Sequence, residues 1–239
     1  MQWFKEGRDV YSEFASKVYN KPVEGITKQE RAVGKTCILG LGYGTGATKL
    51  QMTLKLMAGV EIDEEESKRL VKVYRDVNEK VIQLWRDCEN ALHDIASWPH
   101  TKEPYYLGQH KCLLVTPDGI KLPNGLFIKY RKLRLDTSET RPRFLYKSRR
   151  GEIGIWGGSV VENVVQALAR IIVGEQMLEV NKKYRPVLTV HDAAVCVVPE
   201  DEVESAQEYI MNVMSTPPDW ATVLPVACEA SYGDSYGEC

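Results

Sequence analysis

Residues 30–46, ERAVGKTCILGLGYGTG, constrain the fold of this chain more than any other stretch. If the stretch is helical, Arg31, Lys35, Leu39 and Tyr43 recur every four residues and share one face. Two fixed cations one turn apart are then followed by an apolar and an aromatic side chain. Such a face predicts a helix that presents a nucleotide, with the phosphates at the cationic end and the base at the other.

The same stretch has an alternative interpretation, as a strand that runs into a phosphate-binding, glycine-rich turn. Gly40, Gly42, Gly44 and Gly46 alternate strictly, so the G-x-G-x-x-G spacing of dinucleotide-binding folds is absent. The P-loop pattern is absent from this turn too, because no Lys follows any of these four glycines. Asp63 does lie about 20 residues beyond the glycines, where a ribose-binding acid would be placed. A dinucleotide-binding domain is therefore the weaker alternative.

Local signals favour the helical interpretation. Thr27 and Glu30 have the S/T-x-x-E spacing of a capping box, which starts a helix where the four-residue face requires it. A shorter helix is predicted over residues 9–18. Apolar residues at three- and four-residue steps predict one long helix over residues 64–93 and another over residues 159–181.

Residues 99–135 change to short runs separated by Pro-Asp-Gly and Pro-Asn-Gly turns, which predicts a β-hairpin or meander. A basic strip follows: residues 121–150 hold ten Lys and Arg, Arg131 and Lys132 among them, against two acidic residues. Such a strip in a chain of net charge −2 predicts a polyanionic partner bound through its phosphates. The alternative is a solvated surface loop.

The composition indicates a globular chain, because 239 residues with 44% hydrophobic content can bury a core in one or two domains. The six cysteines form no C-x-x-C pair and have no His at zinc-ligand spacing, as expected of buried thiols in a reducing compartment. No signal peptide opens the sequence, and no apolar run approaches 18 residues. These features predict a cytoplasmic protein without a membrane partner.

A polar pair, His191 and Asp192, interrupts the apolar run VLTVHDAAVCVV at residues 187–198. A carboxylate at the turn of an otherwise apolar hairpin needs a partner cation, so Asp192 is predicted to bind Mg²⁺. Mg²⁺ usually takes few protein carboxylates together with substrate phosphates, which suits two-metal nucleotidyl transfer. On the same evidence His191 is more simply a core or turn residue.

RAVGKTCILGLGYG resembles motif B of the family A DNA polymerases, whose pattern is R-x-x-x-K-x-x-x-(F/Y/L)-x-x-x-Y-G on a fingers helix. The resemblance implies that Arg31 and Lys35 hold the phosphates of the incoming dNTP. It also implies that Leu39 lies against the sugar and base of the dNTP. Tyr43 and Gly44 would guard the position of the templating base.

Three further segments resemble this family. GRDVYSEFASKVYN is similar to the helix before motif B, with Tyr11 where a phosphate-contacting His is common. GGSVVENVVQALAR resembles the phage form of the palm helix whose Gln166 would touch the minor groove of the primer–template. The segment of His191 and Asp192 resembles motif C, V-H-D-E. There the Asp binds the metal ions and the His lies near the primer end, and Ala193 replaces the Glu.

The resemblance implies an α+β fold, as in the C-terminal part of a right-hand polymerase. Mostly helical fingers are expected over residues 1–115. Part of a palm, with an antiparallel sheet, is expected over residues 116–239 and would end in a strand at residues 223–230. If the chain is viral, the expected cytoplasm is that of a host cell.

Motif A of this family, D-Y-S-x-I-E, supplies the other metal-binding Asp, and no D-Y-S occurs in the sequence. We therefore expect a chain that is inactive alone and that acts with a second polymerase chain. That second chain would carry motif A, a thumb and possibly an exonuclease, and its carboxylate would share two Mg²⁺ ions with Asp192. Together they would add dNTPs to a primer 3′ end on a DNA template. The alternative is a non-catalytic DNA-binding relic of a polymerase.

Overall fold

The computed structural model describes residues 2–138 and 140–238, and the chain divides into two compact units. The first unit comprises residues 1–121 and 126–164, and the second comprises residues 122–125 and 165–239. The contacts therefore divide the chain inside a helix near residue 164, and each unit is described by itself below. The assignment of fingers and palm to residues 1–115 and 116–239 stays a prediction.

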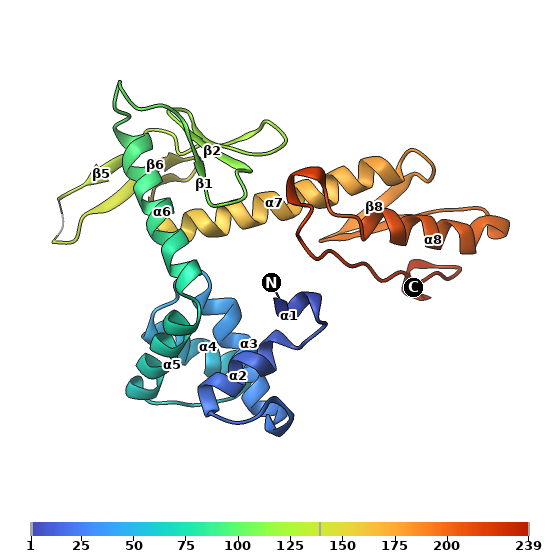
Figure 1. Ribbon diagram of the computed structural model, residues 1–239, viewed down its shortest axis with the longest axis horizontal. Coiled ribbons are helices and arrows are strands. Elements are labelled where there is room, and N and C mark those ends of the chain that lie inside the picture. The colour runs from blue at the N-terminus through green and yellow to red at the C-terminus, as the bar shows by residue number, and fades with distance from the viewer. Residues whose placement is uncertain (1, 139, 239) are drawn as a thin grey trace. The chain divides into compact units, whose positions relative to one another are not determined.

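The first unit opens with six helices (Figure 1). They are α1 (Gln2–Lys5), α2 (Val10–Tyr19), α3 (Lys28–Leu41), α4 (Ala47–Ala58), α5 (Glu64–Val77) and α6 (Glu79–Ala96), with a 3₁₀ turn η1 (Val23–Gly25) between α2 and α3. The predicted helices over residues 9–18 and from Thr27 onward are thus confirmed. No helix among the described residues is long and apolar enough to cross a membrane.

The core of this helical part is apolar and closely packed. Phe14 from α2, Cys37 from α3 and Leu54 from α4 are fully buried in it, and the ring of Phe14 meets Tyr74 of α5 edge to face. Helix α4 had no counterpart among the sequence predictions. Its signal was Leu50 and Leu54, which lie one turn apart and are buried, followed by a Gly59 in the left-handed conformation that ends the helix.

The start of α3 is fixed by the capping box that the sequence predicts. The backbone N–H of Glu30 donates to Thr27 Oγ1 at 3.2 Å, and the Glu30 carboxylate accepts from the backbone N–H of Thr27 at 2.9 Å. The same carboxylate forms an ion pair with Lys21. These contacts, Lys21 first and the Thr27 N–H second, lower the pKa of Glu30 from its ordinary value of 4.5 to about 2.

We expect Glu30→Gln to remove a pH-dependent part of the stability. A carboxyl whose pKa is lower in the folded state stabilises the fold above its unfolded pKa and loses this effect as the pH falls through its folded pKa. Wild type should therefore be the more stable protein at pH 6, and the difference should vanish between about pH 4.5 and pH 2. Urea unfolding at several pH values measures this. Glu24→Gln, in the 3₁₀ turn η1 before α3, is the control. A pH-independent difference for Glu30→Gln would contradict the linkage.

The prediction of one long helix over residues 64–93 is wrong in one respect. The segment forms two helices, α5 and α6, which meet at Asn78. This residue leaves the helical region, with φ −115° and ψ 45°. Its backbone N–H and its side-chain amide both donate to the carbonyl oxygen of Tyr74 at 2.9 Å. The regular helical bond from the Asn78 N–H is therefore kept, and the side-chain amide adds a second hydrogen bond to the same carbonyl at the residue where α5 ends.

Two antiparallel sheets follow α6 in the first unit, which confirms the predicted meander. The four-stranded sheet contains β1 (Tyr105–Leu107), β2 (Leu113–Thr116), β3 (Gly119–Lys121) and β4 (Phe127–Ile128), in that order. The three-stranded sheet contains β5 (Arg134–Asp136), β6 (Arg143–Ser148) and β7 (Gly151–Ile155). The buried ring of Phe144 on β6 packs edge to face on His93 of α6, with ring centroids 4.6 Å apart, and joins this sheet to the helices.

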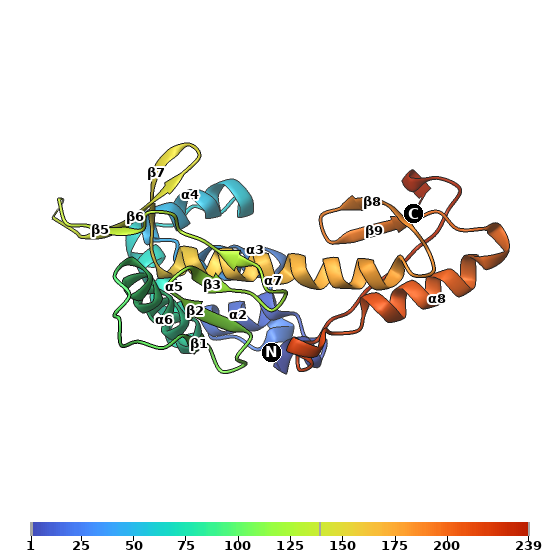
Figure 2. The same cartoon turned by 90° about the horizontal axis from the view of Figure 1, so that it is seen from above.

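Helix α7 (Gly157–Val180) is a long, continuous helix, as predicted over residues 159–181 (Figure 2). The second unit contains its later part, β8 (Pro186–Val190), β9 (Ala193–Cys196) and α8 (Val203–Met214), with the 3₁₀ turns η2 (Glu200–Glu202), η3 (Asp219–Ala221) and η4 (Tyr236–Glu238). Its small core gathers around Val180 of α7, Tyr184 and Ala206 of α8.

The final strand expected at residues 223–230 is not formed. This segment uses its polar backbone groups differently, because the N–H of Cys228 donates to Ser215 Oγ and the carbonyl of Ala230 accepts from the amide of Gln207. Side chains of α8 and of the turn after it thus hold the segment, in place of a strand ladder. The sheet of the second unit consists of β8 and β9.

Candidate nucleotide and nucleic-acid site

Helix α3 has one buried and one exposed face, and the exposed face carries the predicted nucleotide-binding residues. Val33 and Cys37 point into the core of the first unit. Arg31, Lys35 and Leu39 are exposed at four-residue spacing, and Leu39 has 53% of its surface accessible. An apolar side chain this exposed, in line with two cations, leaves the predicted ridge free to meet a ligand.

Tyr11 of α2 lies beneath the two cations of this ridge. The guanidinium carbon of Arg31 is 5.3 Å from the centroid of the Tyr11 ring, and Lys35 Nζ is 5.9 Å from the same centroid. Both distances are within the range of a cation–π contact. The structure therefore brings together Tyr11, Arg31 and Lys35 from two helices, and the aromatic ring contributes its face to the cluster.

The guanidinium of Arg31 is also bound by Asp9, the N-cap residue of α2. Arg31 Nε donates to Asp9 Oδ2 at 2.6 Å, and Nη2 donates to Oδ1 at 3.2 Å. Partial burial raises the pKa of Asp9, but the hydrogen bonds from Arg31, Ser12 and the Tyr11 N–H outweigh it and lower the pKa overall. The same pair raises the pKa of Arg31. Both groups are thus charged across the ordinary pH range.

Asp9 is the site residue that sequence reasoning missed. Its capping role is visible in the sequence, because Asp is a preferred N-cap residue and a helix follows directly. Its contact with Arg31 joins residues 22 positions apart and depends on how α2 packs against α3. No local pattern signals that contact.

Tyr43 and Gly44 lie beyond α3, in a turn, and not on the helix as the four-residue spacing predicts. The helix ends at Leu41 because the chain turns there: the N–H of Tyr43 donates to the carbonyl of Gly40, and that of Gly44 to the carbonyl of Leu41. Gly44 has φ +79°, a conformation that favours glycine.

Two tryptophans hold this turn. A Cβ at Gly44 would lie 2.2 Å from the ring of Trp156, so only glycine leaves room for the indole. The rings of Trp85 and Trp156 meet edge to face with centroids 5.6 Å apart, and Trp85 Nε1 donates to the carbonyl of Gly42 at 3.1 Å. The turn after the ridge is therefore a fixed part of the first unit.

The basic strip is only partly available to a polyanion. Arg134 on β5 is bound by Glu152 of β7 at 3.0 Å and lies 3.7 Å from Asp136. Arg131 and Lys132 occupy an exposed turn before β5, and neither forms an ion pair within the described residues. These two residues, and not Arg134, keep their charge free for a ligand.

The remaining predicted residues belong to the second unit. Gln166 is exposed on α7. His191 and Asp192 form the two-residue turn between β8 and β9, where Val190 pairs with Ala193, and His191 has φ +56°. Both turn side chains are exposed, so His191 is a turn residue and not a core residue. The described residues contain no group of three or more His, Cys, Asp or Glu that could hold a metal ion.

Comparison with known proteins supports the resemblance found in the sequence. Residues 1–96, which contain the Tyr11–Arg31–Lys35 cluster, match the model of DNA polymerase family A. The DNA polymerase of Bacillus phage SP02 is 31% identical over 249 residues, covering 99% of this chain. DNA polymerase I of Aquifex aeolicus (strain VF5) is 40% identical over 84 residues, covering 35% of this chain and 14% of its own length.

The fold has a counterpart among solved structures. The POL domain of Pol1 from M. smegmatis, in complex with DNA primer-template and dNTP, aligns over 95% of this chain and 33% of its own chain. The TM-score is 0.56 and the sequence identity is 18%, which shows a shared fold. The chain spans 37% of the length of its phage SP02 relative. The family match over residues 1–96 and these relatives together show that the chain is similar to part of a family A DNA polymerase.

Proposed function

We propose that this chain supplies the nucleotide-binding ridge and part of the palm of a template-directed DNA polymerase. The observation that carries the proposal is the exposed face of α3, where Arg31 and Lys35 share the Tyr11 ring and Leu39 follows one turn later. Arg and Lys bind phosphate oxygens through charge-assisted hydrogen bonds. The triphosphate of a dNTP would lie on the two cations, with its sugar and base towards Leu39 and the turn that contains Tyr43.

Lys35 would also take part in catalysis. A fixed cation beside the transferring phosphate stabilises the charge that develops there during nucleotidyl transfer. Lys35 has no ion pair among the described residues, so its ammonium is available for that role. Arg31 would bind and orient the same triphosphate.

Several of the predicted residues would contact the primer–template. Arg131 and Lys132 offer exposed charge for backbone phosphates, a contact that fixes position without reading sequence. Gln166 can both donate and accept in the minor groove, where all base pairs present acceptors. Gly44 would border the templating base, and His191 would lie near the primer end.

Asp192 would supply one carboxylate ligand to Mg²⁺. Its exposed carboxylate fits that role, because Mg²⁺ is usually held by one or two carboxylates together with substrate phosphates. Bound there, two Mg²⁺ ions would activate the primer hydroxyl and neutralise the leaving pyrophosphate. We infer that the second carboxylate comes from a separate chain with motif A, a thumb and possibly an exonuclease, and that this chain is inactive without it.

Nucleotide binding by Lys35→Ala tests the proposal. We expect the variant, in the presence of primer–template and Mg²⁺, to bind dNTP about tenfold or more weakly, because a hydrogen bond to a charged group contributes about 1.5–3 kcal/mol. Equilibrium titration of the full chain measures the Kd. Lys49→Ala, which removes an exposed cation from α4, is the matched control and should bind like wild type.

The same titration separates the alternatives. Binding of primer–template with no measurable dNTP binding would favour the non-catalytic DNA-binding relic. Binding of NAD in preference to dNTP, without DNA, would favour the dinucleotide-binding domain. Equal dNTP affinity of wild type and Lys35→Ala would contradict the role of the ridge.

A further inference from the structure

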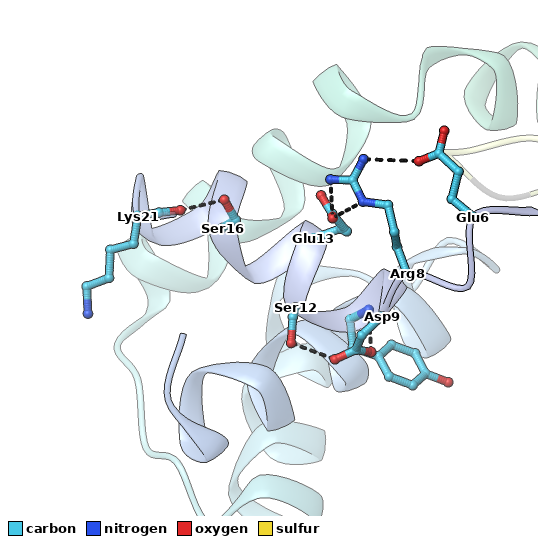
Figure 3. Close-up of polar contacts among 8 residues, drawn as sticks. Glu6, Arg8, Asp9, Ser12, Glu13, Ser16 and Lys21 are labelled. Atoms are coloured by element: carbon cyan, nitrogen blue, oxygen red, sulfur yellow. Dashed lines mark hydrogen bonds and ion pairs between the residues drawn. The ribbon is translucent and has the colours of Figure 1, made fainter. Parts of the chain in front are cut away.

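The carboxylate of Asp9 is held in place by more than its ion pair. Ser12 Oγ donates to Asp9 Oδ2 at 2.5 Å (Figure 3). The backbone N–H of Tyr11 donates to Asp9 Oδ1 at 3.2 Å. Asp9 is thereby the N-cap of α2, fixed at the first turn of that helix. The two carboxylate oxygens of Asp9 also accept hydrogen bonds from Nε and Nη2 of Arg31, which lies on α3. A rigid helix end on one element therefore sets the position of a cation on another.

The geometry leaves part of Arg31 unused. A guanidinium has five N–H donors, of which Asp9 engages one on Nε and one on Nη2. Nη1 has no hydrogen-bond partner within the described residues. The Tyr11 ring covers one side of the guanidinium plane at 5.3 Å. Asp9 and Tyr11 thus fix one edge and one face of Arg31, and the opposite edge is free for the oxygens of a ligand.

We propose that Asp9 is a positioning residue for triphosphate binding. It acts by holding the forked guanidinium group of Arg31 in place before the nucleotide arrives. This inference rests on the proposed nucleotide-binding function of the ridge. An unrestrained Arg side chain loses rotamer freedom when it binds a phosphate, and a pre-oriented fork loses less. Asp9 would therefore strengthen triphosphate binding even though it is itself an anion.

Two effects of opposite sign make this testable. As a charge, Asp9 repels the phosphates, so its removal alone should tighten binding, an effect that water and salt screen at this exposed position. As an anchor, Asp9 orients Arg31, so its removal should weaken binding. We expect the orientation of Arg31 to outweigh the charge repulsion. The sign of the change in triphosphate affinity when Asp9 is replaced decides between the two effects.

Asp9→Ser is the variant to use, because Ser is also a good N-cap residue but is too short to hold both nitrogens of Arg31. Titrated with dATP, Mg²⁺ and primer–template, the full chain should bind dATP about tenfold more weakly than wild type. Unchanged or tighter binding would overturn the inference. Asp63→Ser, which replaces the N-cap of α5, is the matched control and should leave the Kd unchanged.

An Arg31→Lys background shows whether Asp9 acts through the fork of Arg31. Lys has no forked guanidinium to orient, so adding Asp9→Ser to Arg31→Lys should no longer weaken dATP binding. A tenfold loss of dATP affinity in this background would overturn the inference.

If Asp9→Ser lowers the melting temperature, Asp9→Asn replaces it, since Asn caps the helix and keeps one acceptor. About threefold weaker binding is then expected, and unchanged binding overturns the inference.

Failure of this inference differs from failure of the proposed function. If dATP affinity falls in Lys35→Ala but not in Asp9→Ser, the ridge binds nucleotide and only the role of Asp9 is wrong. If dATP affinity is the same in wild type and Lys35→Ala, the proposed function itself fails.

Discussion

Replacing Asp192 with Asn is expected to slow nucleotide incorporation by the assembled polymerase about a thousandfold or more. Asp192 is exposed at the turn between β8 and β9, so its carboxylate is available to a metal ion and is not needed for packing. Asn keeps the size of the side chain but lacks the charge of a good Mg²⁺ ligand. Metal ions contribute several kcal/mol to such reactions, and each tenfold in rate corresponds to about 1.4 kcal/mol.

Single-nucleotide primer extension, with the purified chain and the polypeptide that carries motif A, measures this rate. Asp201→Asn is the matched control, because Asp201 is an exposed acid in the turn η2 of the same unit. It should retain the wild-type rate. A wild-type rate for Asp192→Asn would exclude the metal role. Primer extension by the chain alone at ordinary polymerase rates would show that no second polypeptide is required.

Gly34→Ala is expected to destabilise the first unit by about 3 kcal/mol, the upper end of the range for overpacked cores. Gly34 lies where α3 crosses α2, and a Cβ there would be 2.4 Å from the backbone carbonyl oxygen of Tyr11 and 3.1 Å from Cβ of Ala15. A backbone atom cannot rotate away as a flexible side chain can, so α2 and α3 must separate. Because Tyr11 moves with α2, nucleotide binding should weaken together with stability.

Gly40→Ala, in the same helix, should have the opposite effect. A Cβ at Gly40 would meet Thr45 at ordinary distances, 3.6 Å from Oγ1 and 3.9 Å from Cβ. Ala in a helix is more stable than Gly by up to about 1 kcal/mol, so this variant should be slightly stabilised. Urea unfolding followed by tryptophan fluorescence compares the two. Equal effects of the two substitutions would mean that the close approach at Gly34 does not limit the packing of α2 on α3.

Several features of the fold could be predicted because their causes are local in the sequence. The capping box of Thr27 and Glu30 joins residues three positions apart, and it fixed the start of α3. The four-residue spacing of Arg31, Lys35 and Leu39 placed them on one exposed face. The Pro-Asp-Gly turn gave the β2–β3 connection, where Gly119 has φ +128°. In each case the residues that decide the geometry are neighbours in the chain.

Other features escaped prediction because competing contacts decided them. The stripe over residues 64–93 has a helical period throughout, but Asn78 leaves the helical conformation and its side chain adds a hydrogen bond to the Tyr74 carbonyl, so the stripe is divided into two helices. A strand was expected over residues 223–230, yet contacts from Ser215 and Gln207 hold this segment outside any sheet. The periodicity of apolar residues indicates which secondary structure a segment can form. It does not indicate which hydrogen-bond partners the segment takes in the folded protein.

The sequence by itself determined the ridge on α3, the exposed acid of the β8–β9 turn and the family to which they point. These depend on the spacing of residues along single elements, which helix and strand geometry convert directly into faces and turns. Only the tertiary structure decided what surrounds the ridge: Tyr11 beneath both cations, Asp9 on Arg31 and Trp156 against Gly44. Those contacts join residues far apart in the chain, and their partners are selected by packing, which no local pattern contains.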